Sequence, residues 1–306
     1  MRVDLWTEEI RALIPAQYVL PQEPMTNHTS FRIGGPADLL VLPQTAEQII
    51  KIIDFCRRNG IPHLVIGNGS NLLVRDGGIR GIVIKIAANF SQIQVQDRRI
   101  KAQAGASLNS IAFLACRKGL TGLEFAAGIP GTIGGAVYMN AGAYNGEMKD
   151  VLVQATILTT AGRVETWSEE ELGLAYRHSN VSAQRGIVLD VLLELQKKDP
   201  ESIRTEIRRL LALRKAKQPL DWPSAGSTFK RPPDNYAGAL IEKAGLKGAR
   251  IGDAQVSNRH AGFIINKGHA TAQDVIQLIK HIQKTVYDKF GVQLEPEVRI
   301  VGEDRT

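Results

Sequence analysis

Apolar residues recur every three or four positions in three stretches of the chain, which is the pattern of a helix with one buried face. The stretches are 45–60, 107–119 and 271–291, and each starts at Ser or Thr and stops at Gly. Gln48 and Asp274 stand at the capping-box position of the first and third stretch. The residues that we expect to face inward are Ile49, Ile52, Ile53, Cys56, Ile111, Leu114, Ala115, Val275, Ile279, Ile282, Val286 and Phe290.

Short apolar runs bounded by turn residues predict strands between these helices. The runs are 39–42, 63–66, 81–86, 93–95, 151–159 and 187–195. A last strand is predicted at 294–301, where alternation places Val298 and Ile300 on one face and Glu297 on the other. The mixture of elements indicates the α+β class, and a charged helical stretch from about 203 to 217 indicates a change of domain.

Length and charge narrow the possible functions. The chain has 306 residues, which favours two or three domains over one. Its formal net charge of +7 suits a polyanionic partner, either a nucleic acid or a phosphorylated small molecule. A nucleic-acid module should carry a basic stripe with stacking aromatic residues, but aromatic residues make up 6% and do not cluster with the lysines. A nucleic-acid partner is therefore not expected.

Cysteine and histidine usage indicates neither disulfide nor metal chemistry. Cys56 and Cys116 lie in helix-like patterns without a CxxC pair, so we expect buried thiols in a reducing compartment. The six histidines show no metal-binding spacing, and no metal is expected. The N-terminal stretch 1–14 lacks the apolar core of a signal peptide, and no apolar run is long enough to span a membrane. We therefore expect a cytoplasmic protein.

Two glycine-rich loops carry the clearest chemical signal. The first is Gly67-Asn-Gly-Ser-Asn71, directly after an apolar strand, and the second is Gly128-Ile-Pro-Gly-Thr-Ile-Gly-Gly135. Neither fits the Rossmann or P-loop spacing. Glycine nevertheless lets the backbone approach a ligand, and successive N–H groups can converge on an anion such as a diphosphate. On spacing alone, two tight turns that only join strands explain the loops about equally well.

Six motifs in order resemble one enzyme family. They are His28-Thr-Ser-Phe-Arg-Ile-Gly-Gly-Pro-Ala-Asp38, the first glycine loop, the second with Asn140-Ala-Gly-Ala-Tyr144, Tyr176-Arg-His-Ser179, Ser224-Ala-Gly-Ser-Thr-Phe-Lys230 and Leu294-Glu-Pro-Glu-Val-Arg299. Together they resemble the UDP-N-acetylenolpyruvoylglucosamine reductases of peptidoglycan synthesis. The resemblance covers nearly the whole chain and is far more specific than a single glycine loop.

The resemblance implies an FAD-binding fold of the vanillyl-alcohol-oxidase type, with two α+β lobes and a C-terminal substrate domain. The expected parts are a first lobe at 1–86, a second lobe at 87–197 and the substrate domain at 198–297, with 298–306 returning to the first lobe. The stretch between Arg177 and Ser227 is short. The chain therefore resembles the branch of the family without an extra tyrosine-bearing loop.

The resemblance also implies the reaction. NADPH reduces noncovalently bound FAD, and the flavin N5 then delivers hydride to the vinyl C3 of UDP-N-acetyl-3-O-(1-carboxyvinyl)-glucosamine. Protonation at C2 gives UDP-N-acetylmuramate, so the activity is that of a UDP-N-acetylmuramate dehydrogenase. Such a reaction needs a cation at the substrate carboxylate, a proton donor and a fixed alignment of the alkene.

Three residues match these needs by motif. The resemblance makes Ser227 the donor of the C2 proton, Arg177 the cation at the carboxylate and Glu297 the group that polarises the intermediate or orients the donor. Spacing alone favours structural roles for all three: a turn or cap serine for Ser227, a surface ion pair for Arg177 and a salt bridge with Arg299 for Glu297.

Further residues are expected to bind cofactor and substrate. The FAD set is Gly67, Asn68, Gly69, Ser70, Asn71, Gly128, Gly131, Thr132, Gly134 and Gly135. The substrate set is Tyr138, Asn140, Lys217, Lys230 and Lys243, in which the lysines are candidate diphosphate ligands. Tyr144 is a further candidate for lining the pocket. We expect a UDP-sugar as the partner of a monomeric protein.

Two other functions compete with this interpretation. A flavin oxidase or dehydrogenase of the same fold need not carry Ser227, Arg177 and Glu297 together. A nucleotide-sugar-binding regulator that has lost catalysis should lack one of the three, and none is missing. Both alternatives make different predictions for the redox behaviour of the purified protein.

Overall fold

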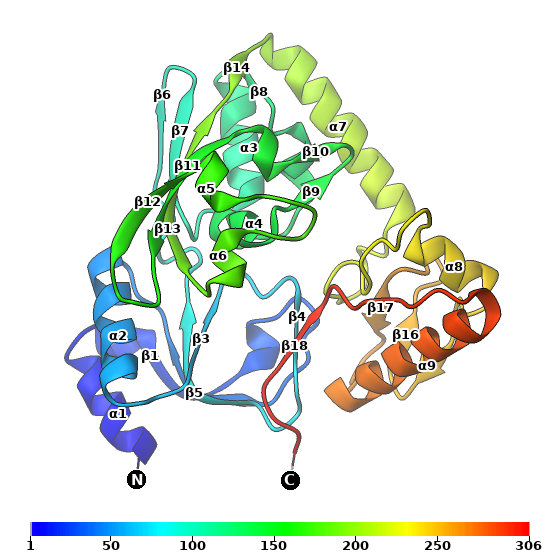
Figure 1. The fold of residues 1–306 in the computed structure, drawn as a ribbon, viewed down its shortest axis with the longest axis horizontal. Coiled ribbons are helices and arrows are strands. Elements are labelled where there is room, and N and C mark those ends of the chain that lie inside the picture. Colours follow the sequence, from blue (N-terminus) through cyan, green and yellow to red (C-terminus); the bar gives the residue numbers. More distant parts are fainter. Residues whose placement is uncertain (1, 306) are drawn as a thin grey trace. The chain divides into compact units, whose positions relative to one another are not determined.

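The computed structural model describes residues 2–305 as an α+β protein (Figure 1). The chain forms two compact units, each assembled from separate stretches of sequence. Unit 1 contains the residues up to Leu20 together with 40–68 and 82–214, and unit 2 contains 21–39, 69–81 and the residues from Lys215 onward. The division into three parts with breaks after 86 and 197 stays a prediction.

Unit 1 is built on an antiparallel sheet with the strand order β12-β11-β13-β7-β6. The strands are β6 (Ile93–Gln96), β7 (Arg99–Gln103), β11 (Leu152–Leu158), β12 (Val164–Ser168) and β13 (Ile187–Glu194). The helices of the unit are α1 (Arg2–Arg11), α2 (Ala46–Arg58), α3 (Leu108–Arg117), α4 (Ile133–Met139), α5 (Glu169–Leu172), α6 (Asn180–Ala183) and most of α7 (Pro200–Lys217). Helix α4 packs against β13 and β7, which fixes the helix that follows the second glycine loop.

A second sheet has the order β1-β2-β5-β3. Its strands are β1 (Val19–Pro24), β2 (Pro36–Val41), β3 (His63–Ile66) and β5 (Ile79–Lys85). Strands β3 and β5 are parallel, with Ile66 opposite Lys85, and the first glycine loop begins directly after Ile66. This loop therefore leaves the carboxyl end of a parallel strand, where ligands commonly bind in α/β sheets.

Unit 2 packs α9 (Ala272–Phe290) and α8 (Ala237–Lys243) with a small sheet in the order β15-β16-β17. The strands are β15 (Arg250–Ile251), β16 (Ala254–Val256) and β17 (Ile264–Asn266). Strand β18 (Arg299–Val301) pairs in parallel with β4 (Leu72–Val74). The core of the unit includes buried Phe31, Ile33, Leu73, Ile241, Val275 and Ile282.

The remaining elements are short. They are η1 (Ala16–Tyr18), η2 (Met25–Asn27), η3 (Glu124–Gly128) and η4 (Met148–Asp150), with β8 (Leu120–Thr121), β9 (Gly142–Ala143), β10 (Gly146–Glu147) and β14 (Gln196–Lys197). Strands β9 and β10 form a hairpin whose two turn residues, Tyr144 and Asn145, have φ of 51° and 65°. Positive φ at both positions is the signature of a type I′ turn.

All three predicted helices are present. The Thr45 hydroxyl accepts the N–H of Gln48 at 3.2 Å, but the Gln48 side chain accepts the N–H of Gln44 at 2.7 Å, one residue before the expected partner. At α9 the capping box is complete, because Thr271 and Asp274 exchange side-chain and backbone bonds of 3.0 and 2.9 Å. The inward faces are mostly buried, and Phe290 differs at 39% exposed because it lies in the last turn before Gly291.

The predicted strand at 294–301 is a strand only over Arg299–Val301. The residues before it pair instead with a second extended stretch, in which Phe229 bridges to Pro296 and Lys230 donates its N–H to Glu295 O at 2.9 Å. Pro296 supplies no N–H, which limits regular ladder formation there. This local pairing positions one of the expected site residues, Glu297.

Candidate functional site

Close backbone packing in unit 2 explains why the first glycine loop needs glycine at position 69. Gly69 is buried with φ of 64°, and its carbonyl accepts the N–H of Ser30 at 3.2 Å. A Cβ at this position would lie 2.1 Å from the carbonyl oxygen of His28. No other residue fits this space without moving the backbone, so the loop is built for close approach.

The second glycine loop contacts the beginning of the first one within unit 1. A Cβ on Gly67 would lie 2.4 Å from Thr132 Oγ1, and Asn68 Nδ2 donates to the Pro130 carbonyl at 3.3 Å. Thr132 also caps α4 by accepting the N–H of Gly135 at 3.3 Å. Within unit 1, Gly67 and Asn68 of the first loop therefore adjoin the second loop.

The backbone N–H groups of these loops divide into used and unused donors. Ile133 and Gly134 donate to the carbonyls of Ala106 and Ala104, both at 2.8 Å. Within residues 2–305, by contrast, no acceptor receives the N–H of Gly67, Asn68, Gly69, Ser70, Gly131 or Thr132. Unpaired N–H groups on adjoining glycine turns are the donor set that a diphosphate requires. Within unit 1, the free donors of Gly67, Asn68, Gly131 and Thr132 therefore fit a diphosphate such as that of FAD.

Arg177 is held by the end of the helix that follows the second loop. Asn140 is fully buried, and its Nδ2 donates to the Ala175 carbonyl at 3.1 Å while its Oδ1 accepts the N–H of Lys149 at 3.0 Å. The buried Ser179 hydroxyl donates to the Tyr138 carbonyl at 2.8 Å. These bonds anchor both sides of the turn that carries Arg177. They give Asn140 a structural role beside its expected contact with substrate.

The guanidinium of Arg177 lies over the ring of Tyr176, with Cζ 5.1 Å from the ring centroid. Its backbone φ is 53°, a left-handed conformation that is uncommon outside glycine. Backbone strain of this kind persists where the surrounding structure holds it, and it gathers at functional sites.

Unit 2 brings Ser227 and Glu297 together. Ser227 precedes Thr228, whose carbonyl accepts the N–H of Glu297 at 2.8 Å. Asn71 Nδ2 donates to the Glu297 carbonyl at 3.1 Å, so the residue that ends the first glycine loop holds the same strand. Ser227 and Glu297 are both half-buried, as groups that meet a ligand should be. The backbones of the two residues therefore lie close together, and the pairing of the Ser227 hydroxyl with the Glu297 carboxylate stays a prediction.

The candidate lysines differ in their surroundings. Lys230 forms an ion pair with Glu295, and its ammonium already has a counter-charge. Lys217 ends α7 and Lys243 lies in the last turn of α8, and both are exposed without an ion pair in the described part of the chain. Lysine at such positions can meet a phosphate as a point charge. Of the three, Lys217 and Lys243 are better placed to accept an added anion.

Arg214 in α7 is a candidate that the sequence analysis missed. Burial lowers the pKa of its guanidinium, and within residues 2–305 it forms no ion pair or hydrogen bond. Its Cδ lies 2.8 Å from where a Cβ on Gly128 would stand, so Gly128 makes room for this side chain. A desolvated cation without a counter-ion is costly and offers a partner to an anionic group of cofactor or substrate. Its position in the sequence could have revealed it. Arg214 lies four residues after buried Leu210 and seven after buried Ile207, a spacing that places all three on the same face of the helix.

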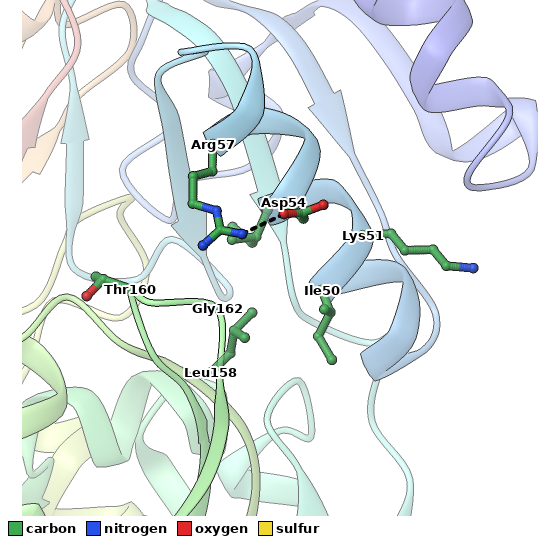
Figure 2. Close-up of a pocket in the computed structure, with 8 residues that line it drawn as sticks. Ile50, Lys51, Asp54, Arg57, Leu158, Thr160 and Gly162 are labelled. Carbon is green, nitrogen blue, oxygen red and sulfur yellow. Dashed lines mark hydrogen bonds and ion pairs between the residues drawn. The ribbon is translucent and has the colours of Figure 1, made fainter.

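A pocket of about 180 Å³ lies elsewhere in unit 1 (Figure 2). Its lining residues are Ile50, Lys51, Ile53, Asp54, Arg57, Leu158, Thr160 and Gly162. Figure 2 shows Arg57 reaching across toward Gly162, while its guanidinium bonds to Asp54 at 2.8 Å. None of the expected site residues lines this pocket.

Three other features of the described residues concern thiol reactivity, metal-binding clusters and membrane-spanning helices. Burial raises the pKa of Cys56 to about 12, which suppresses its thiolate at neutral pH. No group of three or more metal-binding side chains is found between residues 2 and 305. Among the helices of that range, none has the length and apolar composition needed to cross a membrane.

Comparison with known proteins agrees with this geometry. Residues 37–168 match the model of an FAD binding domain, and residues 218–301 match the C-terminal domain of UDP-N-acetylenolpyruvoylglucosamine reductase. The chain is similar to the UDP-N-acetylenolpyruvoylglucosamine reductase of Alkaliphilus oremlandii, with 53% identity over 95% of this chain and 96% of the relative. The corresponding protein of Clostridium tetani is 50% identical over 95% of this chain and 94% of its own length.

A solved structure is similar along nearly the whole length. The crystal structure of UDP-N-acetylenolpyruvylglucosamine reductase from Thermus caldophilus superimposes with a TM-score of 0.79 at 37% identity, covering 92% of this chain and 97% of that one. Sequence identity, domain content and fold thus point the same way. The chain belongs to the UDP-N-acetylenolpyruvoylglucosamine reductase family.

Proposed function

We propose that this protein reduces UDP-N-acetyl-3-O-(1-carboxyvinyl)-glucosamine to UDP-N-acetylmuramate with NADPH and noncovalently bound FAD. The family membership supports the reaction, and the match to an FAD binding domain supports the cofactor. The observation that carries the proposal is the backbone hydrogen bond from Glu297 to Thr228, which places Glu297 beside Ser227 in unit 2. The N–H groups of Gly67, Asn68, Gly131 and Thr132 in unit 1, which receive no acceptor in residues 2–305, support binding of the FAD diphosphate there.

The protein's own residues supply binding, charge and a proton. Held at the glycine loops, FAD would supply the hydride chemistry that links NADPH to the vinyl C3 of the substrate. Arg177 stabilises the negative charge that develops on the substrate carboxylate. Ser227 donates the proton to C2, and Glu297 orients or polarises the reacting groups. Tyr138, Asn140, Lys217, Lys230 and Lys243 are proposed substrate contacts.

Three further features belong to the proposal. The chain acts in the cytoplasm, where its nucleotide substrates are made. It functions as a monomer. It belongs to the branch of the family without the tyrosine-bearing loop, so its lysines carry more of the diphosphate binding.

The absorption spectrum of the purified protein tests the proposal. We expect flavin bands that bleach with NADPH under anaerobic conditions and return when the enolpyruvyl sugar nucleotide is added. A flavin that returns only with oxygen would instead identify an oxidase of the same fold. A protein that neither contains nor takes up FAD would remove the flavin role of the glycine loops.

A further inference from the structure

A loop of unit 2 from Ser257 to Phe263 is fixed by hydrogen bonds within itself. The hydroxyl of Ser257, which is 1% exposed, accepts the N–H groups of Arg259 at 3.1 Å and His260 at 3.3 Å. The Phe263 N–H donates to the His260 carbonyl at 3.0 Å, and the Ser257 N–H donates to the Phe263 carbonyl at 2.9 Å. The backbone of His260 therefore has a single well-defined position.

The ring of His260 is wedged between two glycines. A Cβ on Gly238 would lie 3.1 Å from its Cε1, and a Cβ on Gly262 would lie 3.0 Å from the same atom. The Phe263 ring packs edge-on, with 5.0 Å between the centroids. Packing thus fixes the orientation of the imidazole as well as its location.

Two hydrogen bonds connect this imidazole to the site. His260 Nδ1 accepts the N–H of Gly262 at 3.1 Å, and the Gly262 carbonyl accepts the N–H of Thr228 at 2.8 Å. Thr228 directly follows Ser227, and its own carbonyl holds the N–H of Glu297. A series of hydrogen bonds therefore runs from His260 to Thr228, the residue covalently next to Ser227, and on to the N–H of Glu297.

We propose that His260 is a positioning residue for proton delivery: its neutral imidazole, acting through Gly262, holds the strand that carries Ser227. The inference rests on the proposed role of Ser227. His260 itself takes no part in the chemistry. It acts by keeping Nδ1 as an acceptor, since a proton on Nδ1 would turn the ring into a donor facing the Gly262 N–H.

The surroundings of the ring favour the neutral form at pH 7. Burial lowers the pKa of His260 below its ordinary 6.5, and the positive charges of Lys247 and Lys217 act in the same direction. A backbone hydrogen bond at His260 and the charge of Glu242 in α8 raise the pKa in opposition, but Glu242 forms an ion pair with Lys247 at 2.6 Å. Acceptance by Nδ1 places the single proton of the neutral ring on Nε2. Protonation of His260 should then loosen the Ser227 strand below pH 6.5.

The test compares the two half-reactions of the holoenzyme by anaerobic stopped-flow between pH 5 and 8. We expect re-oxidation of the reduced flavin by the enolpyruvyl sugar nucleotide to fall on the acid side with an apparent pKa below 6.5. Flavin reduction by NADPH should lack this acid limb. Hydrogen exchange of the Thr228 amide should accelerate over the same pH range, which reports the strand independently of turnover.

Two substitutions separate the hydrogen bond from packing. In His260→Asn, Oδ1 stands where Nδ1 was and accepts the Gly262 N–H without titrating, so the acid limb should disappear while activity at pH 7.5 stays within a few-fold of wild type. His260→Phe keeps a ring between the glycines but offers no acceptor. It should slow re-oxidation roughly tenfold to a hundredfold at every pH, because small displacements of a reacting group are costly.

The outcomes distinguish this inference from the proposal on which it rests. An acid limb that persists in His260→Asn, or a His260→Phe enzyme with wild-type re-oxidation, would overturn the role of His260 alone. Full re-oxidation activity in Ser227→Ala would overturn the proton-donor assignment, whatever the His260 variants do. Unaltered Thr228 exchange in His260→Phe would show that the relay does not hold the strand.

Discussion

At the scale of single residues, buried polar side chains hold the backbone of the candidate site in place. The buried side chains of Asn140 and Ser179 form hydrogen bonds that anchor the turn carrying Arg177. The φ of Arg177 itself is 53°. A left-handed conformation outside glycine costs on the order of 1–3 kcal/mol, and the anchors offset that cost. The backbone position of Arg177 is therefore fixed by the protein itself.

Ser227→Ala should leave flavin reduction by NADPH close to wild type and slow substrate reduction by about a hundredfold or more, since a general acid contributes this much. Rapid-reaction measurement of each half-reaction checks the expectation. Ser224→Ala is the matched control, because Ser224 lies in the same loop and uses its carbonyl, which accepts the Ser30 hydroxyl at 2.7 Å. Equal loss in both half-reactions would remove Ser227 from proton transfer.

Arg214→Met should affect the two forms of the protein in opposite directions. Without FAD, removal of a desolvated charge should leave thermal stability unchanged or raise it. With FAD, we expect dissociation of the cofactor or substrate to become about tenfold easier, as charged hydrogen bonds are worth about 1.5–3 kcal/mol. Arg208→Met on the exposed face of α7, where Arg208 is 69% exposed, controls for the lost charge. If binding is unchanged, Arg214 serves packing alone.

At the scale of elements, the loops matter more than the helices that frame them. Gly69 and Gly60 have nearly the same φ, 64° and 61°. A Cβ on Gly69 would collide with the His28 carbonyl, whereas one on Gly60 would meet nothing within 4 Å. Substitutions at both positions introduce the same backbone strain, but only a substitution at Gly69 also introduces a steric clash. Comparing Gly60 with Gly69 therefore distinguishes the two effects.

Gly69→Ala should therefore purify with much less flavin than wild type, and Gly60→Ala should retain it. Both lose about 1–2 kcal/mol of stability from left-handed backbone at alanine, and Gly69→Ala loses more because backbone must move. The ratio of flavin to protein absorbance, with urea denaturation for stability, measures both effects. A fully loaded Gly69→Ala protein would reduce the first loop to a plain turn.

The sequence predicted elements with strong periodicity and missed those without it. Helices α2, α3 and α9 were found because apolar spacing and caps agree, while α4 was hidden inside the glycine motif and α8 has seven residues. Motifs predicted site roles for Ser227 and Glu297, which stay predictions, and the closeness of their backbones depends on pairing between 228–230 and 295–298. Pairing between distant segments leaves no local pattern, and the half-buried Arg214 was hidden by the surrounding charges of α7.

At the scale of the whole molecule, ionisation of His260 should make the free energy of unfolding depend on pH. The pKa of His260 is lowered in the native protein, so the unfolded chain binds a proton more readily. Neutral His260 therefore leaves the free energy of unfolding at its full value above pH 6.5. As pH falls from 6.5 through the native pKa, the unfolded chain takes up the proton first and the free energy of unfolding decreases. Urea denaturation at pH 5.5 and 7.5 should show a smaller difference in His260→Asn than in wild type. An equal difference would assign the pH dependence to other groups.

Both compact units are discontinuous, and unit 2 has the more extreme arrangement. It combines 21–39 and 69–81 with the residues from Lys215 onward, and β4 pairs with β18, which lies more than two hundred positions later. A ribosome makes the chain in one direction, so β4 emerges long before its partner exists. Throughout that interval it presents an open strand edge that can pair wrongly with other chains. We therefore expect stalled or C-terminally truncated products to be aggregation-prone and to expose β4, even when unit 1 has already folded around its own sheet.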